Sequence, residues 1–187
     1  QNLKLPLMKT RLLLFLLFAF SVGNAQINVS EGFESGTLPA GWTSTNIDGV
    51  VINSQSCSGT RSVRANYYAT TNAAIYTSSY ISNGGPIDVQ FVARKQTGAF
   101  FGTKYLYYEV NGSGTWTLIT SQYSDFSTCT AISATIAQGV ISNGSSVKFR
   151  MQVNSASASN VTYLYFDDFT ALQQSPPIPQ VIAEYNF

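Results

Sequence analysis

The chain has 187 residues, of which only 10% are charged, and it contains no histidine. Without histidine there is no Ser-His or Cys-His nucleophile pair and no histidine-ligated zinc, so we expect no enzyme built on these groups. The formal charge of +1 leaves no basic surface for a phosphate backbone, so we expect no nucleic-acid partner.

Residues 8–25 have the layout of a secretory signal peptide. Two basic residues precede an unbroken apolar run at 12–20, and small residues stand before Gln26. This run is shorter than the ~20 residues of a transmembrane helix, so we expect cleavage and secretion rather than a membrane anchor. Residues 1–7 precede the first methionine and are interpreted as upstream read-through. The predicted mature chain keeps seven basic and nine acidic residues, and no apolar segment in it could span a membrane.

Alternating apolar and polar residues predict one β-strand after another across residues 26–172. Every second residue is apolar in three of these segments, 87–95, 105–110 and 147–153. Asn-Gly and Gly-rich clusters separate the strands and favour tight turns. Further strands are expected at 62–68, 73–81, 115–120 and 131–137. About ten strands with one apolar face each predict an all-β fold, an antiparallel β-sandwich of the jelly-roll type.

Two cysteines, Cys57 and Cys129, are the only ones in the chain. In an oxidising compartment such a pair can form a disulfide, so secretion favours a bridge between them. The alternative is a pair of free buried thiols.

The predicted domain ends near residue 172. Residues 173–180 are rich in proline, which suits a stiff linker and not a central strand. Residues 181–187 are again mostly apolar, and we interpret them as the start of a further domain.

Four segments resemble motifs of the cleaved-adhesin and choice-of-anchor J domains of secreted Bacteroidota proteins, which are MAM-like jelly rolls. They are EGFESGTLPAGW at 31–42, CSGTRSVRANYY at 57–68, VKFRMQV at 147–153 and YLYFDDFTAL at 163–172. The resemblance implies a secreted or cell-surface module without catalytic activity, which serves in adhesion and binds extracellular protein or glycan. The alternative is a carbohydrate-binding accessory module of a secreted hydrolase.

Two adjacent aspartates, Asp167 and Asp168, interrupt the last apolar strand. Phe166 and Phe169 on either side both look core-directed, although they are three residues apart and the strand period is two. A β-bulge at the aspartates would reconcile the two, because it lets both rings face the core and turns the carboxylates sideways.

Clustered carboxylates in a chain with so few charges suggest a cation. The first and last strands of a jelly roll commonly lie together, so Glu34 could meet Asp167 and Asp168, and carboxylate oxygens suit calcium. We therefore predict a structural calcium site, with Glu31 and Asp48 as weaker candidate ligands. The alternative is that these carboxylates cap turns or pair with surface Lys and Arg side chains.

Aromatic side chains suggest a second kind of site. Tyr105 and Tyr107 are predicted to face outward, where their rings could stack on sugars. Tryptophans Trp42 and Trp116 are expected in the core. The alternative for the tyrosines is cross-strand packing that only stabilises the sheet.

Overall fold

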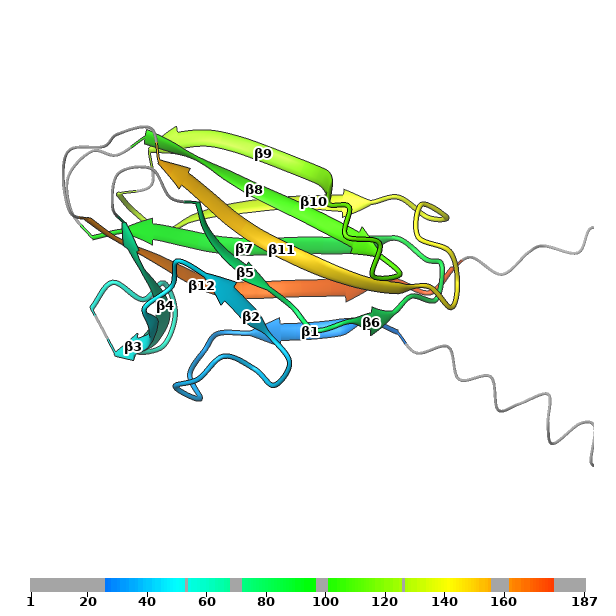
Figure 1. Cartoon of the computed structure of the whole chain (residues 1–187), viewed down its shortest axis with the longest axis horizontal. Helices are drawn as coiled ribbons and strands as arrows, with labels where there is room; N and C mark the ends of the chain where they lie inside the picture. Colours follow the sequence, from blue (N-terminus) through cyan, green and yellow to red (C-terminus); the bar gives the residue numbers. More distant parts are fainter. Residues whose placement is uncertain are drawn as a thin grey trace, which may run out of the picture.

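The computed structural model shows two antiparallel β-sheets packed face to face (Figure 1). The residues it describes are 26–52, 54–67, 72–96, 101–125, 127–155 and 162–176. All regular elements in these ranges are strands, which confirms the predicted all-β sandwich. No helix in the same ranges could cross a membrane. The predicted signal peptide at 8–25 and the segment 181–187 lie outside the described residues, as does the second half of the predicted linker at 173–180.

Sheet A has the strand order β10-β7-β12-β4-β3, with β1 also paired to β12. Its strands are β1 (Asn28–Glu31), β3 (Gly49–Ile52), β4 (Arg61–Tyr67), β7 (Ile87–Lys95), β10 (Thr130–Ile136) and β12 (Thr162–Gln173). The first and last of these strands run antiparallel, with Glu31 opposite Phe169. This pairing brings the two ends of the domain together, as the sequence predicted.

Sheet B has the order β2-β5-β11-β8-β9, with β6 also paired to β11. Its strands are β2 (Thr43–Thr45), β5 (Ala73–Tyr76), β6 (Tyr80–Ile81), β8 (Phe101–Val110), β9 (Thr117–Asp125) and β11 (Ser146–Ser155). The single strand predicted at 73–81 is therefore two strands. Between them, the Thr77 hydroxyl accepts the N–H of Phe149 at 3.0 Å, so a side chain replaces part of the backbone ladder.

The core lies between the sheets and has an aromatic centre. Phe33, Phe149 and Phe169 are completely buried. Trp42 packs edge-on against Phe33 and Phe169, with ring centroids 6.1 and 5.4 Å apart, and its indole N–H donates to the Tyr80 hydroxyl. The prediction that Trp42 points inward is confirmed.

The predicted bulge in β12 is present. Asp167 pairs with Val92 of β7, and Thr170 pairs with Gln90, so two residues of β12 face a single residue of β7. Phe166 and Phe169 on its two sides are both fully buried. Asp168 takes the left-handed conformation with φ of 45°, which aspartate tolerates better than most residues.

One lysine is part of the interior. Lys104 on β8 has no exposed surface, and its ammonium donates to the carbonyl oxygen of Thr130 at 3.2 Å. Burial lowers the pKa of Lys104 to about 8, because desolvation penalises the charged form. This group lies inside the sandwich and is not accessible to a ligand.

Candidate functional site

The carboxylates at the two ends of the domain hold one loop, residues 54–60, between β3 and β4. Asp167 has no exposed surface, and its Oδ2 accepts the backbone N–H groups of Cys57 at 2.7 Å and Ser58 at 3.1 Å. Its Oδ1 accepts the N–H of Asp168 at 2.9 Å. Burial raises the pKa of Asp167, and the N–H donors act in the opposite direction.

Glu34 binds the other end of the same loop. Its carboxylate accepts the N–H of Thr60 at 3.0 Å and that of Arg61 at 2.8 Å, together with the Thr60 hydroxyl. These bonds lower the pKa of Glu34, the Arg61 N–H most of all. Gly59 lies next to the Glu34 carboxylate. Its φ is 55°, and a Cβ added at this position would lie 2.5 Å from the Glu34 carboxyl carbon.

The remaining candidate ligands have partners of their own. The Ser58 hydroxyl donates to Asp168, Glu31 accepts the N–H of Phe33, and Asp48 forms an ion pair with Arg64 at 3.0 Å. Within the described part of the chain, no group of three or more Asp, Glu or Cys side chains is placed to hold a metal. Glu34, Asp167 and Asp168 thus converge on one loop, and each of them binds N–H or O–H groups of that loop.

The same loop carries half of the disulfide. Cys57 and Cys129 are bridged, with their Cα atoms 5.6 Å apart, which confirms the predicted pair. The bridge joins loop 54–60 to the connection between β9 and β10. The loop is therefore fixed by one covalent bond and by carboxylates from both ends of the domain.

We expect Asp167→Ala to lower the free energy of unfolding by about 2 to 3 kcal/mol, because it leaves partly buried N–H groups without an acceptor. The matched control is Asp168→Asn, which keeps an oxygen for Ser58 and tolerates the positive φ, so its cost should stay under about 1 kcal/mol. Urea unfolding followed by tryptophan fluorescence measures both. Equal losses for the two variants would contradict the role given to Asp167.

A second group of side chains lies on the outer face of sheet B. We call Tyr76, Tyr105, Tyr107, Trp116 and Arg150 the aromatic surface. Arg150 of β11 pairs in register with Tyr76 of β5 on one side and Tyr107 of β8 on the other, so the three side chains form a row across the sheet. The Arg150 guanidinium lies 3.8 Å from the Tyr107 ring centroid.

Trp116 packs against this row of side chains. Its ring lies 5.5 Å from Tyr76 and 4.9 Å from the Arg150 guanidinium, and its side chain is half-buried. The expectation that Trp116 belongs to the core is wrong: it lies between β8 and β9, before the first paired residue of β9, and so reaches the outer face. Tyr105 stacks on Tyr107, with centroids 5.8 Å apart and planes inclined by 20°. Both tyrosines are half-buried, and both lie on the outer face.

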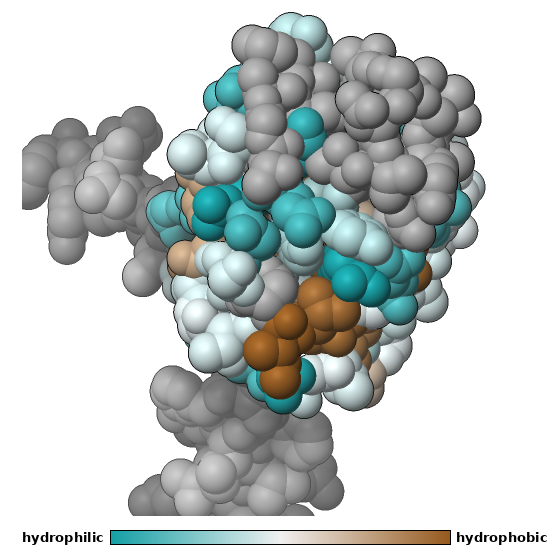
Figure 2. Space-filling model, turned by 90° about the vertical axis from the view of Figure 1, so that its left-hand side faces the viewer, coloured by the Kyte–Doolittle hydropathy of each residue, from teal (hydrophilic) through white to brown (hydrophobic). Residues whose placement is uncertain are grey.

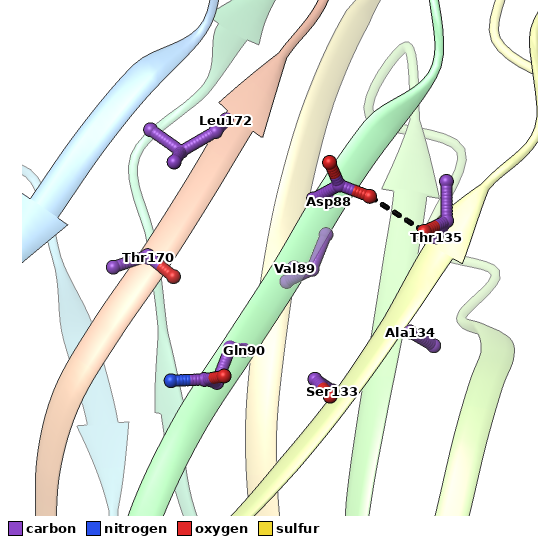
Figure 3. Close-up of a pocket in the computed structure, with 8 residues that line it drawn as sticks. All are labelled: Asp88, Val89, Gln90, Ser133, Ala134, Thr135, Thr170 and Leu172. Carbon is purple, nitrogen blue, oxygen red and sulfur yellow. Dashed lines mark hydrogen bonds between the residues drawn. The ribbon is translucent and has the colours of Figure 1, made fainter.

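Sheet A offers a different surface, a shallow depression of about 340 Å³ across β10, β7 and β12 (Figure 3). It is lined by Asp88, Val89, Gln90, Ser133, Ala134, Thr135, Thr170 and Leu172. The Asp88 carboxylate accepts the Thr135 hydroxyl at 2.5 Å and the Gln174 amide at 3.1 Å. None of the lining residues has an aromatic ring, so this depression lacks a stacking platform.

No family model and no curated protein sequence matches the chain. Solved structures with the same fold do match. TmCBM61 in complex with β-1,4-galactotriose has a TM-score of 0.55 at 16% identity, and the match covers 76% of this chain and 94% of the TmCBM61 chain. The CBM22-1 xylan-binding domain of Paenibacillus barcinonensis Xyn10C has a TM-score of 0.58 at 16% identity, over 82% and 99% of the two chains.

The K1 cleaved adhesin domain of Lys-gingipain from Porphyromonas gingivalis W83 is similar to the same degree. Its TM-score is 0.57 at 14% identity, and the match covers 80% of this chain and 99% of the adhesin domain. At these identities the likeness shows the fold. The chain is a jelly-roll β-sandwich of the kind found in carbohydrate-binding modules and cleaved-adhesin domains.

Proposed function

We propose that this protein is a secreted or cell-surface binding module without catalytic activity, and that its aromatic surface binds glycan chains. The observation that carries the proposal is the row of Tyr76, Arg150 and Tyr107 with Trp116 above it. Aromatic rings supply large, rigid contact area, and the polar ends of Tyr and Trp can also hydrogen-bond to hydroxyl groups. Sugar rings present both apolar faces and hydroxyls.

Three further observations support this proposal. Glu34 and Asp167 accept backbone N–H groups of loop 54–60, whereas glycoside hydrolysis requires two carboxyl groups that flank the bond to be cleaved. Solved structures with the same fold include a galactotriose complex and a xylan-binding domain. The disulfide and the signal-peptide pattern suit an extracellular location.

A glycan array followed by isothermal titration with the best ligand tests the proposal. We expect Tyr107→Ala to weaken binding about tenfold or more, because an aromatic anchor at the centre of a binding surface carries much of the affinity. The control is Tyr163→Ala on β12 of sheet A, which removes a half-buried tyrosine that, like Tyr107, lies against an arginine, here Arg64 of β4. Its affinity should equal that of the wild type. Equal losses for both variants would contradict the proposed surface.

Adhesion to a protein is the second candidate, and one observation favours it. β3 is one of the edge strands of sheet A, and Ile52 at its end is 69% exposed. Figure 2 views the end of the sandwich where β3 lies and shows a hydrophobic patch within a mostly hydrophilic surface. An edge strand of this kind can accept an extended peptide as an added strand. This candidate would be favoured if the wild type binds a matrix protein but no glycan, and if Ile52→Lys abolishes the binding to that protein.

The calcium site remains a prediction of the sequence, with Glu34 and Asp167 as its ligands. An ion there would have to draw the two carboxylates away from the N–H groups of loop 54–60. Millimolar calcium over a site with a dissociation constant of ~10 µM would add about 2.7 kcal/mol, which raises the melting temperature by several degrees. Thermal melts in calcium and in chelator test this. Identical melting temperatures in calcium and in chelator would contradict the calcium site and leave loop 54–60 as the only partner of these carboxylates.

A further inference from the structure

We infer that the aromatic surface is selective for glycans that carry carboxylates, the uronic acid polymers, and that Arg150 is the residue that reads the carboxylate. This inference rests on the proposed function, because it names the ligand class of the same surface. It goes beyond ring stacking, since stacking alone does not distinguish a neutral sugar from an acidic one.

The first step is the position of Arg150 among the rings. Its guanidinium lies 3.8 Å from the centroid of Tyr107 and 4.9 Å from that of Trp116. Two such neighbours fix the plane of the guanidinium, and a fixed fork loses less freedom when it binds a carboxylate. The side chain is half-buried, so part of it still faces solvent.

The second step is charge. Within the described ranges Arg150 forms no ion pair, and its Nε is shielded from water without a hydrogen-bond partner. The nearest charged residues along the same face are Lys148, two positions away on β11, and Glu109, which lies opposite Lys148 in register. Glu109 already accepts the N–H of Gly114 at 2.6 Å. Among the described residues, no carboxylate therefore pairs with the Arg150 guanidinium, and a bound anion can supply one.

The third step is the match in shape. A uronic acid carries its carboxylate on the sugar ring, so a sugar that lies across the aromatic surface beside Arg150 can present that group to the guanidinium. A planar carboxylate takes two parallel N–H bonds from a guanidinium, an arrangement that ammonium cannot reproduce. Partly shielded rings around the pair strengthen the attraction, because they exclude water.

The test uses matched ligands: oligogalacturonate and oligomannuronate, each beside its methyl ester, titrated calorimetrically into the protein. The ester keeps the sugar ring and removes the charge. We expect at least one acid to bind about tenfold or more tightly than its ester, since a charge-assisted bidentate pair is worth at least that factor. Arg150→Gln should remove this preference and leave ester binding within about threefold.

Two further variants separate shape from charge. Arg150→Lys keeps the charge and should lose most of the preference, whereas Lys148→Gln removes the same charge two residues away and should keep most of it. Circular dichroism melts confirm that each variant is folded.

Equal binding of acid and ester by the wild type would overturn the inference, as would binding of neutral oligosaccharides alone. The same holds if Arg150→Gln weakens acid and ester equally, which indicates a packing role. These results leave glycan binding itself intact, whereas failure to bind any glycan, acidic or neutral, would overturn the proposed function as well.

Discussion

Phe169→Ala is expected to lower the free energy of unfolding by about 3 to 5 kcal/mol, the range for deleting a large aromatic side chain from a packed core. Phe169 is fully buried, and its ring contacts those of Trp42, 5.4 Å away, and Phe149, 6.1 Å away. It therefore joins the first turn of the domain to both sheets. Chemical denaturation followed by circular dichroism gives the value.

Leu172→Ala is the control for this substitution. Leu172 lies three residues further along β12 and is 45% exposed, so its truncation should cost less than about 1 kcal/mol. A Phe169→Ala protein as stable as the Leu172→Ala protein would show that the bulge does not turn Phe169 into the core.

The second large effect is that of the disulfide. The cysteines are 72 residues apart, and closing a loop of this length stabilises the fold by about 4 kcal/mol in the chain-entropy model. We expect the double variant Cys57→Ser, Cys129→Ser to lose about that much. Its loop 54–60 should still be held by Asp167 and Glu34, so the variant should fold at low temperature.

Unfolding of the wild type with and without reductant is the complementary measurement. Reductant should lower the stability of the wild type to that of the double variant and leave the variant unchanged. Equal stability of the oxidised and reduced wild type would contradict the expected contribution of the bridge.

Much of the fold follows from patterns that the sequence shows directly. Strict alternation along β7 predicted its buried face, and the broken period between Phe166 and Phe169 predicted the bulge. The short strands β1, β2 and β3 have no such pattern, because three or four residues at a sheet edge show little alternation. They form because neighbouring strands, β12, β5 and β4, offer them unpaired backbone groups.

The aromatic surface was only partly predictable. Alternation in β8 placed Tyr105 and Tyr107 on the outer face, but it could not show what stands opposite them. The row of Tyr76, Arg150 and Tyr107 depends on the register of three strands far apart in the chain, and a single sequence does not contain that register. Trp116 was misplaced because a residue just before a strand has no alternation to orient it.

The burial of Lys104 was also missed. It continues the inward-facing series of Leu106 on β8, yet lysine is almost never expected in a core. Asp167 and Glu34 were singled out as candidate calcium ligands because carboxylates are scarce in this chain, and the bulge was expected at Asp167 and Asp168. The N–H groups that they bind could not be predicted, because these groups belong to loop 54–60, which shows no alternation of apolar and polar residues that would place it in the fold.

The central claim is that the aromatic surface of sheet B is the binding site. Mapping of amide and indole NMR shifts, with the best glycan from the array, tests it most directly. We predict shifts at Tyr76, Tyr105, Tyr107 and Arg150 and at the Trp116 indole, with little change on sheet A. Shifts confined to the depression on sheet A around Asp88, Gln90 and Thr170 (Figure 3) would contradict the claim.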